Sequence, residues 1–290
     1  TFTMATKKYV IIGGSGFIGS HLSKALLQQK NNIVSIDDFS TTSFGFGDFQ
    51  IKNYRANIED TKKVEGIFKQ EKPDVVFHLA GPINLRRSID EPLFLKDIHF
   101  LLRTRIVLDA CRENNIEKVV FISSGGALYE NAAKVPTKED YVVHPTSLYV
   151  LANLSIEKYI ELYSKIHGIN FTVARLANVY GPGQWESGLV PSLILKMLKN
   201  EPPIIYGTGK QTRDLVYIDD VVQALMLLAE KGRNTIYNVG SSKEVILNDV
   251  HTMLRDLVGV KIKAIYQSLR APETKRSALS IIIIKKELGW

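Results

Sequence analysis

Short apolar runs alternate with longer segments whose apolar positions recur every three or four residues, as far along the chain as Arg175. The short runs predict buried strands and the longer segments predict amphipathic helices. The predicted strands span 9–12, 33–37, 53–56, 74–79, 118–123 and 170–175, and the predicted helices span 17–29, 62–70, 92–114 and 147–167. Strands that alternate with helices form a parallel sheet that is covered on both faces. We therefore expect an α/β fold with a doubly wound parallel sheet.

The pattern changes after Arg175, where the apolar runs shorten and glycine and proline become frequent. Short elements between turn residues are typical of a small lobe laid over the edge of a larger sheet. We expect a first domain at 4–175, to which segments of about 211–240 return. A smaller C-terminal lobe is expected at 176–210 and 241–290.

The first predicted strand ends in a glycine-rich turn that leads into a helix. Gly13, Gly16 and Gly19 are spaced three residues apart in this turn. Glycine allows a close approach of the backbone to a ligand, and a helix N-terminus attracts a pyrophosphate. Asp37 ends the second strand, where a carboxylate accepts hydrogen bonds from a ribose diol and repels a 2′-phosphate. The pattern predicts a Rossmann-type sheet that binds NAD rather than NADP.

Composition narrows the class of protein. The chain has 290 residues, of which 45% are hydrophobic, so it can bury a large core. Cys111 is its one cysteine, which rules out an intramolecular disulfide and favours a reducing, cytoplasmic location. The longest aliphatic run, at 281–284, is far shorter than the ~20 residues that a membrane span needs. The net charge of +7 is scattered among acidic residues, so we expect no nucleic-acid partner.

Two other kinds of chemistry find little support in the sequence. The six histidines, at 21, 78, 99, 144, 167 and 251, show no metal-ligand spacing, and with a single cysteine we expect no metal site. Ser124 has no evident histidine and aspartate partners, so a hydrolase triad is not predicted.

Short motifs run in a fixed order nearly from end to end of the chain. They are 13–21 (GGSGFIGSH), 37–38 (DD), 78–80 (HLA), 123–129 (SSGGALY), 145–149 (PTSLY), 178–183 (NVYGPG), 213–220 (RDLVYIDD), 237–241 (YNVGS) and 288–290 (LGW). Together they resemble the extended short-chain dehydrogenases/reductases of the NAD-dependent epimerase/dehydratase family. These are nucleotide-sugar enzymes of the UDP-glucose 4-epimerase type, with a substrate-binding C-terminal lobe.

The resemblance implies a set of cofactor-binding residues. Asn57 and Ile58 would lie beside the adenine, where the family usually has Asp-Ile. The residues that would hold NAD or line its path are Gly13, Gly16, Phe17, Ile18, Gly19, Asp37, Leu79, Ala80 and Gly81.

The resemblance also implies a nucleoside-diphosphate sugar as substrate, most commonly a UDP-sugar. Asn178 and Arg213 would meet its diphosphate, with Arg270 as a second cation. Two guanidinium groups can fork onto pyrophosphate oxygens. A homodimer is implied as well, with the helices at 92–114 and 147–167 as the paired elements.

Three residues would carry the catalysis that the resemblance implies. Tyr149 would be the acid/base at the sugar hydroxyl, and Ser124 is the best candidate for the assisting hydroxyl. An unperturbed tyrosine has a pKa near ~10 and is a poor base at neutral pH. The family lowers that pKa with a lysine four residues after the tyrosine, on the same helix face. Asn153 stands at that position, and it carries no charge.

Other positions also depart from the family pattern. Phe100 and Arg103 stand where the family commonly has asparagine and glycine in the long helix. Gly125 occupies the usual place of the catalytic serine or threonine, one residue from Ser124. Glu130 replaces the glycine that usually follows the tyrosine at 129.

Two functional interpretations remain open. In the first, the chain is an NAD-dependent 4-epimerase, or a related enzyme that oxidises C4 of the sugar, and Arg103, Arg86 or Arg87 supplies the missing charge. In the second, it is a catalytically impaired protein that binds NAD and a nucleotide sugar as the partner subunit of an active relative.

Overall fold

The computed structural model describes residues 6–40, 51–81, 94–130, 132–186, 188–268 and 274–290. Its centre is a seven-stranded sheet in the order β11-β6-β5-β4-β1-β2-β3, in which every neighbouring pair is parallel. The strands are β1 (Lys8–Ile12), β2 (Asn32–Asp37), β3 (Lys52–Arg55), β4 (Val75–His78), β5 (Lys118–Ser124), β6 (Asn170–Leu176) and β11 (Ile236–Val239). The expected doubly wound α/β fold is confirmed.

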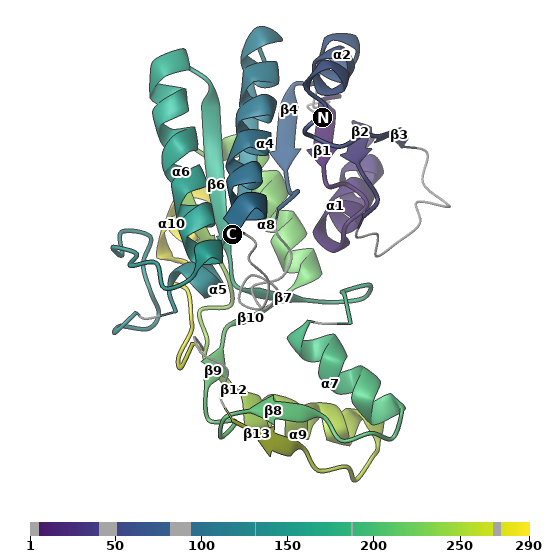
Figure 1. Cartoon of the computed structure of the whole chain (residues 1–290), viewed down its shortest axis with the longest axis vertical. Coiled ribbons are helices and arrows are strands. Elements are labelled where there is room, and N and C mark those ends of the chain that lie inside the picture. The colour runs from purple at the N-terminus through teal and green to yellow at the C-terminus, as the bar shows by residue number, and fades with distance from the viewer. Residues whose placement is uncertain (1–5, 41–50, 82–93, 131, 187, 269–273) are drawn as a thin grey trace.

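Helices cover both faces of this sheet. The helices on one face are α2 (Thr61–Glu71), α4 (Phe94–Glu113) and α6 (Leu148–His167), and those on the other are α1 (Phe17–Gln28), α8 (Ile218–Lys231) and α10 (Ile282–Leu288). In Figure 1, α4 and α6 lie side by side in front of the sheet and α8 lies behind it. Each face buries its own apolar cluster, because both faces of a parallel strand need cover.

A smaller lobe lies below the sheet in Figure 1 and is built from short elements. They are α7 (Leu189–Leu198), β8 (Ile204–Tyr206), β9 (Thr212–Arg213), β12 (Val245–Ile246), α9 (Leu247–Val258) and β13 (Ile265–Gln267). Between the lobe and the sheet, β7 (Asn178–Tyr180) pairs in parallel with β10 (Leu215–Tyr217).

The last helix, α10, packs on the sheet and not on the small lobe. Residues 241–290 were expected in the small lobe, whereas α10 packs against α8 and β11. Its buried Ile284 belongs to the apolar cluster of that sheet face. The apolar run at 281–284 is therefore a helix start that covers the sheet edge. Among the described residues, no helix is long and apolar enough to cross a bilayer.

Candidate active site

A cleft of about 930 Å³ lies between the carboxyl ends of the sheet strands and the small lobe. Parallel strands place ligand sites at this edge, at the point where the strand order reverses. The sequence-predicted residues that line the cleft are Gly13, Gly16, Phe17, Ile18, Gly19, Asp37, Asn57, Ile58, Leu79, Ala80, Gly81, Ser124, Tyr149, Asn153, Asn178 and Arg213. Arg270, Arg86 and Arg87 lie outside the described residues.

The glycine turn after β1 depends on the absence of side chains. Gly13 has φ +82°, and a Cβ on it would lie 2.9 Å from the backbone nitrogen of Ala80. A Cβ on Gly19 would lie 2.3 Å from the carbonyl oxygen of Gly13. The turn therefore brings β1, β4 and α1 together. Gly16 caps α1 without a side-chain hydrogen bond, so the N-terminus of α1 faces the cleft with its positive dipole end.

Asp37 is fixed at the end of β2 by two backbone donors. Its carboxylate accepts hydrogen bonds from the N–H groups of Ser15 and Phe39, each at 2.8 Å. Each carboxylate oxygen has a further lone pair for a ribose hydroxyl. The turn and this carboxylate fit a dinucleotide, with its pyrophosphate at α1 and its adenosine ribose at Asp37.

The turn after β5 explains the glycine at position 125. A Cβ on Gly125 would lie 2.5 Å from Cδ2 of Leu279, and Gly125 does not line the cleft. Ser124, one residue earlier, does line it. A side chain at 125 would thus meet the closing segment of the chain, whereas Ser124 can present its hydroxyl to the cleft.

Ser123 is a candidate that sequence reasoning missed. It lines the cleft, is 3% exposed, and its hydroxyl has no hydrogen-bond partner among the described residues. Buried hydroxyls normally find partners, so this oxygen is suited to a bound ligand. The signal in the sequence was the Ser-Ser pair at the end of a strand, which offers Ser123 as a further hydroxyl next to Ser124.

Tyr149 and Asn153 lie one helical turn apart near the start of α6. The Ser147 hydroxyl caps this helix by accepting the N–H of Val150 at 3.2 Å, so Tyr149 sits in the first turn. Asn153 is buried, and its Nδ2 donates to the carbonyl oxygen of Tyr149 at 2.9 Å. The amide is thus engaged within the helix, and the family's lysine position holds no charge.

Phe100 forms part of an aromatic wall beside the cleft. Its ring centre is 6.0 Å from that of His78 and 6.3 Å from that of Phe121. A Cβ on Gly81 would lie 2.8 Å from the Phe100 ring, so the ring fills this space. Burial lowers the pKa of His78 to about 4, which keeps this imidazole neutral.

Arg103 is held at the end of the cleft that Asn57 and Ile58 line. Its Nε and Nη2 lie 2.8 and 2.7 Å from Oε1 of Glu59, which also contacts Nδ1 of His99 at 3.0 Å. The hydrogen bond from His99 and the bond and charge of Arg103 hold the pKa of Glu59 below its ordinary value. Among the described residues, the ion pair that the structure shows for Arg103 is with Glu59. No hydrogen bond or ion pair is shown among these residues between Arg103 and α6, the helix that bears Tyr149.

Arg213 and Asn178 meet the cleft where the lobe joins the sheet. Nη1 of Arg213 donates to the carbonyl oxygens of Thr212 and Thr274, each at 2.8 Å. The N–H of Asn178 donates to the carbonyl oxygen of Asp214 at 2.9 Å. These bonds place a cation and an amide on the lobe side of the cleft.

The sheet, the glycine turn and the cleft define a Rossmann-type fold whose cleft fits a dinucleotide, and comparison with known proteins places it more closely. The sequence model of the NAD dependent epimerase/dehydratase family matches residues 9–240. The chain therefore belongs to this family, whose cofactor is NAD.

Individual relatives cover almost the whole chain. The UDP-glucose 4-epimerase of Mycolicibacterium smegmatis is 31% identical over 97% of this chain and 92% of its own length. The crystal structure of UDP-glucose 4-epimerase from Thermotoga maritima with UDP-glucose is 33% identical, with a TM-score of 0.93 over 98% of this chain and 93% of that one. The Thermus thermophilus UDP-glucose 4-epimerase complex with NAD is 28% identical, with a TM-score of 0.90 over 98% and 93%.

Proposed function

We propose that this protein oxidises C4 of a UDP-sugar and re-reduces the ketone from its opposite face, and so interconverts the two C4 epimers. The observation that carries the proposal is the cleft itself. Its lining includes the hydroxyl-bearing Tyr149 and Ser124 together with the glycine turn of the sheet and Arg213 of the lobe. A dinucleotide and a nucleoside-diphosphate sugar can enter from these two sides with their reacting ends meeting at the hydroxyls.

In this proposal the chain's own residues bind, orient and move a proton. Arg213 and Asn178 hold the diphosphate oxygens, with Arg270 as a second cation. Tyr149 takes the proton from the C4 hydroxyl and later returns it, while Ser124 hydrogen-bonds the same oxygen. The chemistry that NAD supplies is the acceptance of a hydride from C4 and its return.

The reduction of bound nicotinamide tests this proposal. We expect that UDP-glucose added to the NAD-loaded protein produces the absorbance of reduced nicotinamide, followed by the C4 epimer in the NMR spectrum. UDP, which has no sugar to oxidise, is the matched control. Silence across a panel of UDP-, dTDP-, GDP- and CDP-sugars would contradict the proposal.

The second candidate function is a protein that binds NAD and a nucleotide sugar without turning them over, as the partner subunit of an active relative. It is favoured by Asn153, whose amide is engaged with the helix backbone and carries no charge. In that case a UDP-sugar raises the melting temperature of the NAD-loaded protein while the nicotinamide stays oxidised.

We also propose a homodimer that forms through α4 and α6. These helices lie side by side, and on α6 the side chains of Leu151, Leu162 and Ile166 are exposed. Exposed apolar side chains on adjacent helices are typical of interfaces. Light scattering should give twice the mass of the chain, and a monomer at micromolar concentration would contradict the proposal. The buried, lone Cys111 supports a reducing compartment such as the cytoplasm.

A further inference from the structure

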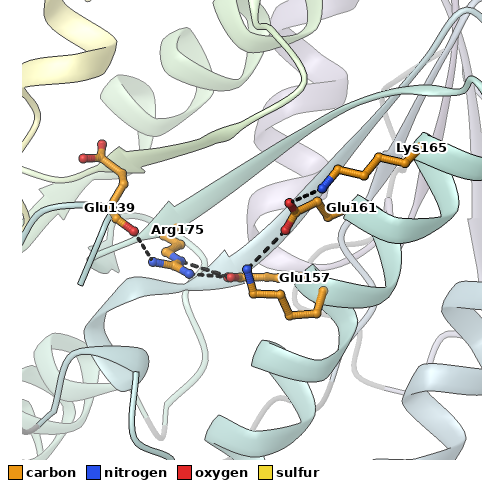
Figure 2. Close-up of polar contacts among 6 residues, drawn as sticks. Glu139, Glu157, Glu161, Lys165 and Arg175 are labelled. Atoms are coloured by element: carbon orange, nitrogen blue, oxygen red, sulfur yellow. Dashed lines mark hydrogen bonds and ion pairs between the residues drawn. The ribbon is translucent and has the colours of Figure 1, made fainter. Parts of the chain in front are cut away.

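A buried ion pair joins β6 to α6 next to two cleft-lining residues, Leu176 on the strand and Asn153 on the helix. Arg175, near the end of β6, is 3% exposed, and Glu157 on α6 is 2% exposed. Nε of Arg175 lies 3.0 Å from Oε1 of Glu157, and Nη2 lies 2.6 Å from Oε2. Figure 2 shows this two-point contact between strand and helix. The fork fixes the direction of the guanidinium as well as its distance.

The same guanidinium also reaches the segment after β5. Its Nη1 donates to the hydroxyl of Tyr129 at 2.8 Å and to the carbonyl oxygen of Glu139 at 3.2 Å. The Tyr129 hydroxyl in turn donates to Oδ1 of Asn238 at 2.9 Å. Burial raises the pKa of Tyr129 to about 12, against the opposing charge of Arg175, so this phenol keeps its proton.

The two ends of this network lie in the same two segments of the chain as the two proposed catalytic hydroxyls. Tyr129 directly follows α5 (Gly125–Leu128), and the residue that caps the start of α5 is Ser124. Glu157 lies two helical turns after Tyr149, so both belong to one face of α6, with Asn153 between them. Arg175 therefore joins the segment that bears Ser124 to the helix that bears Tyr149.

Stability alone is a weak reason for such a pair. Taking two charges out of water costs several kcal/mol per ion, and apolar replacements of similar volume are often neutral or stabilising. Geometry is the better reason, because a misplacement of ~1 Å at a reacting group can cost about a hundred-fold in rate.

We propose that Arg175 is a positioning residue that sets the separation between the Ser124 hydroxyl and the Tyr149 phenol. It does so by holding Glu157 and Tyr129 at once. This inference rests on the proposed function, which gives Ser124 and Tyr149 their roles.

The test replaces both charges together, since removing one would leave the other buried and unpaired. In the variant Arg175→Met with Glu157→Leu, we expect a folded protein with unchanged affinity for NAD and an unchanged KM for UDP-glucose. We expect kcat to fall by roughly ten- to a hundred-fold, because the hydroxyls lose their fixed separation. Tyr129→Phe, which removes only one link of the network, should lower kcat by a smaller factor.

The matched control lies on the outer side of the same helix. Glu161 pairs there with Lys158 at 3.1 Å and with Lys165 at 3.0 Å, and these pairs are exposed (Figure 2). Exposed pairs contribute little, so Glu161→Gln should leave kcat, KM and the melting temperature unchanged.

Two results would overturn the inference. One is a double variant that melts at a lower temperature but keeps the wild-type kcat, which would make the pair a purely structural contact. The other is a crystal structure of that variant with an unchanged distance between the Ser124 and Tyr149 hydroxyls. The crystal structure needs no turnover, so it decides the inference even if the wild-type protein fails the nicotinamide reduction test of the proposed function.

Discussion

Replacing Asn153 with lysine is expected to raise the rate of hydride transfer by roughly ten-fold or more. The side chain at 153 is buried, lines the cleft, and lies one helical turn from Tyr149 on the same face. An ammonium group ~4–6 Å from a phenol favours the phenolate by about one to three pKa units. Each unit corresponds to about 1.36 kcal/mol. Stopped-flow absorbance of the reduced nicotinamide measures the rate.

The pH dependence of the rate shows whether the lysine lowers the pKa of Tyr149. A base that acts as phenolate becomes active as the pH rises through its pKa. The lysine should therefore move the midpoint of this rise to lower pH. Asn153→Met is the control, because it has a long side chain without a charge. A fall in hydride transfer for Asn153→Lys, with unchanged NAD affinity, would mean that another cation already serves the site.

Tyr149→Phe is expected to lower the rate of hydride transfer by about a hundred- to ten-thousand-fold, which is the usual contribution of a positioned acid/base. The ring remains, so the cleft keeps its shape and the affinity for NAD should be unchanged in a fluorescence titration. Tyr266→Phe is the matched control, since this exposed tyrosine hydrogen-bonds Asn248 at 3.0 Å on the small lobe. Wild-type rates in Tyr149→Phe would exclude this tyrosine as the base.

The sheet was largely predictable because most of its strands are short apolar runs between amphipathic helices. Its edge strand β11 was not predicted as a strand, although 211–240 was expected to return to the sheet. With four residues that include the buried Asn238, it has no clear apolar pattern. The small lobe was predicted only in outline for a similar reason. A strand such as β9 has two residues and exists through its pairing with β12, which is distant in the chain.

The cleft-lining residues could be located from motifs because strand ends in a parallel sheet meet at one edge. Contacts that depend on the packing of long side chains could not be predicted from motifs. Nothing local in the sequence shows that Arg175 reaches Glu157 and Tyr129 at once, or that Glu59 engages Arg103. Both facts depend on the direction of a long side chain, which the surrounding helices set.

Gly125 and Leu279 are far apart in the sequence but adjacent in the fold, so the side chain at one position affects what fits at the other. A larger residue at 125 would displace the Leu279 side chain, because a Cβ at 125 would lie 2.5 Å from Cδ2 of that leucine. A serine or threonine at 125 would therefore be accommodated more easily together with a smaller side chain at 279. Ser124, one residue earlier, lines the cleft whichever residue stands at 125. The packing of a segment distant in the chain thus influences which side chains this point of the site accommodates.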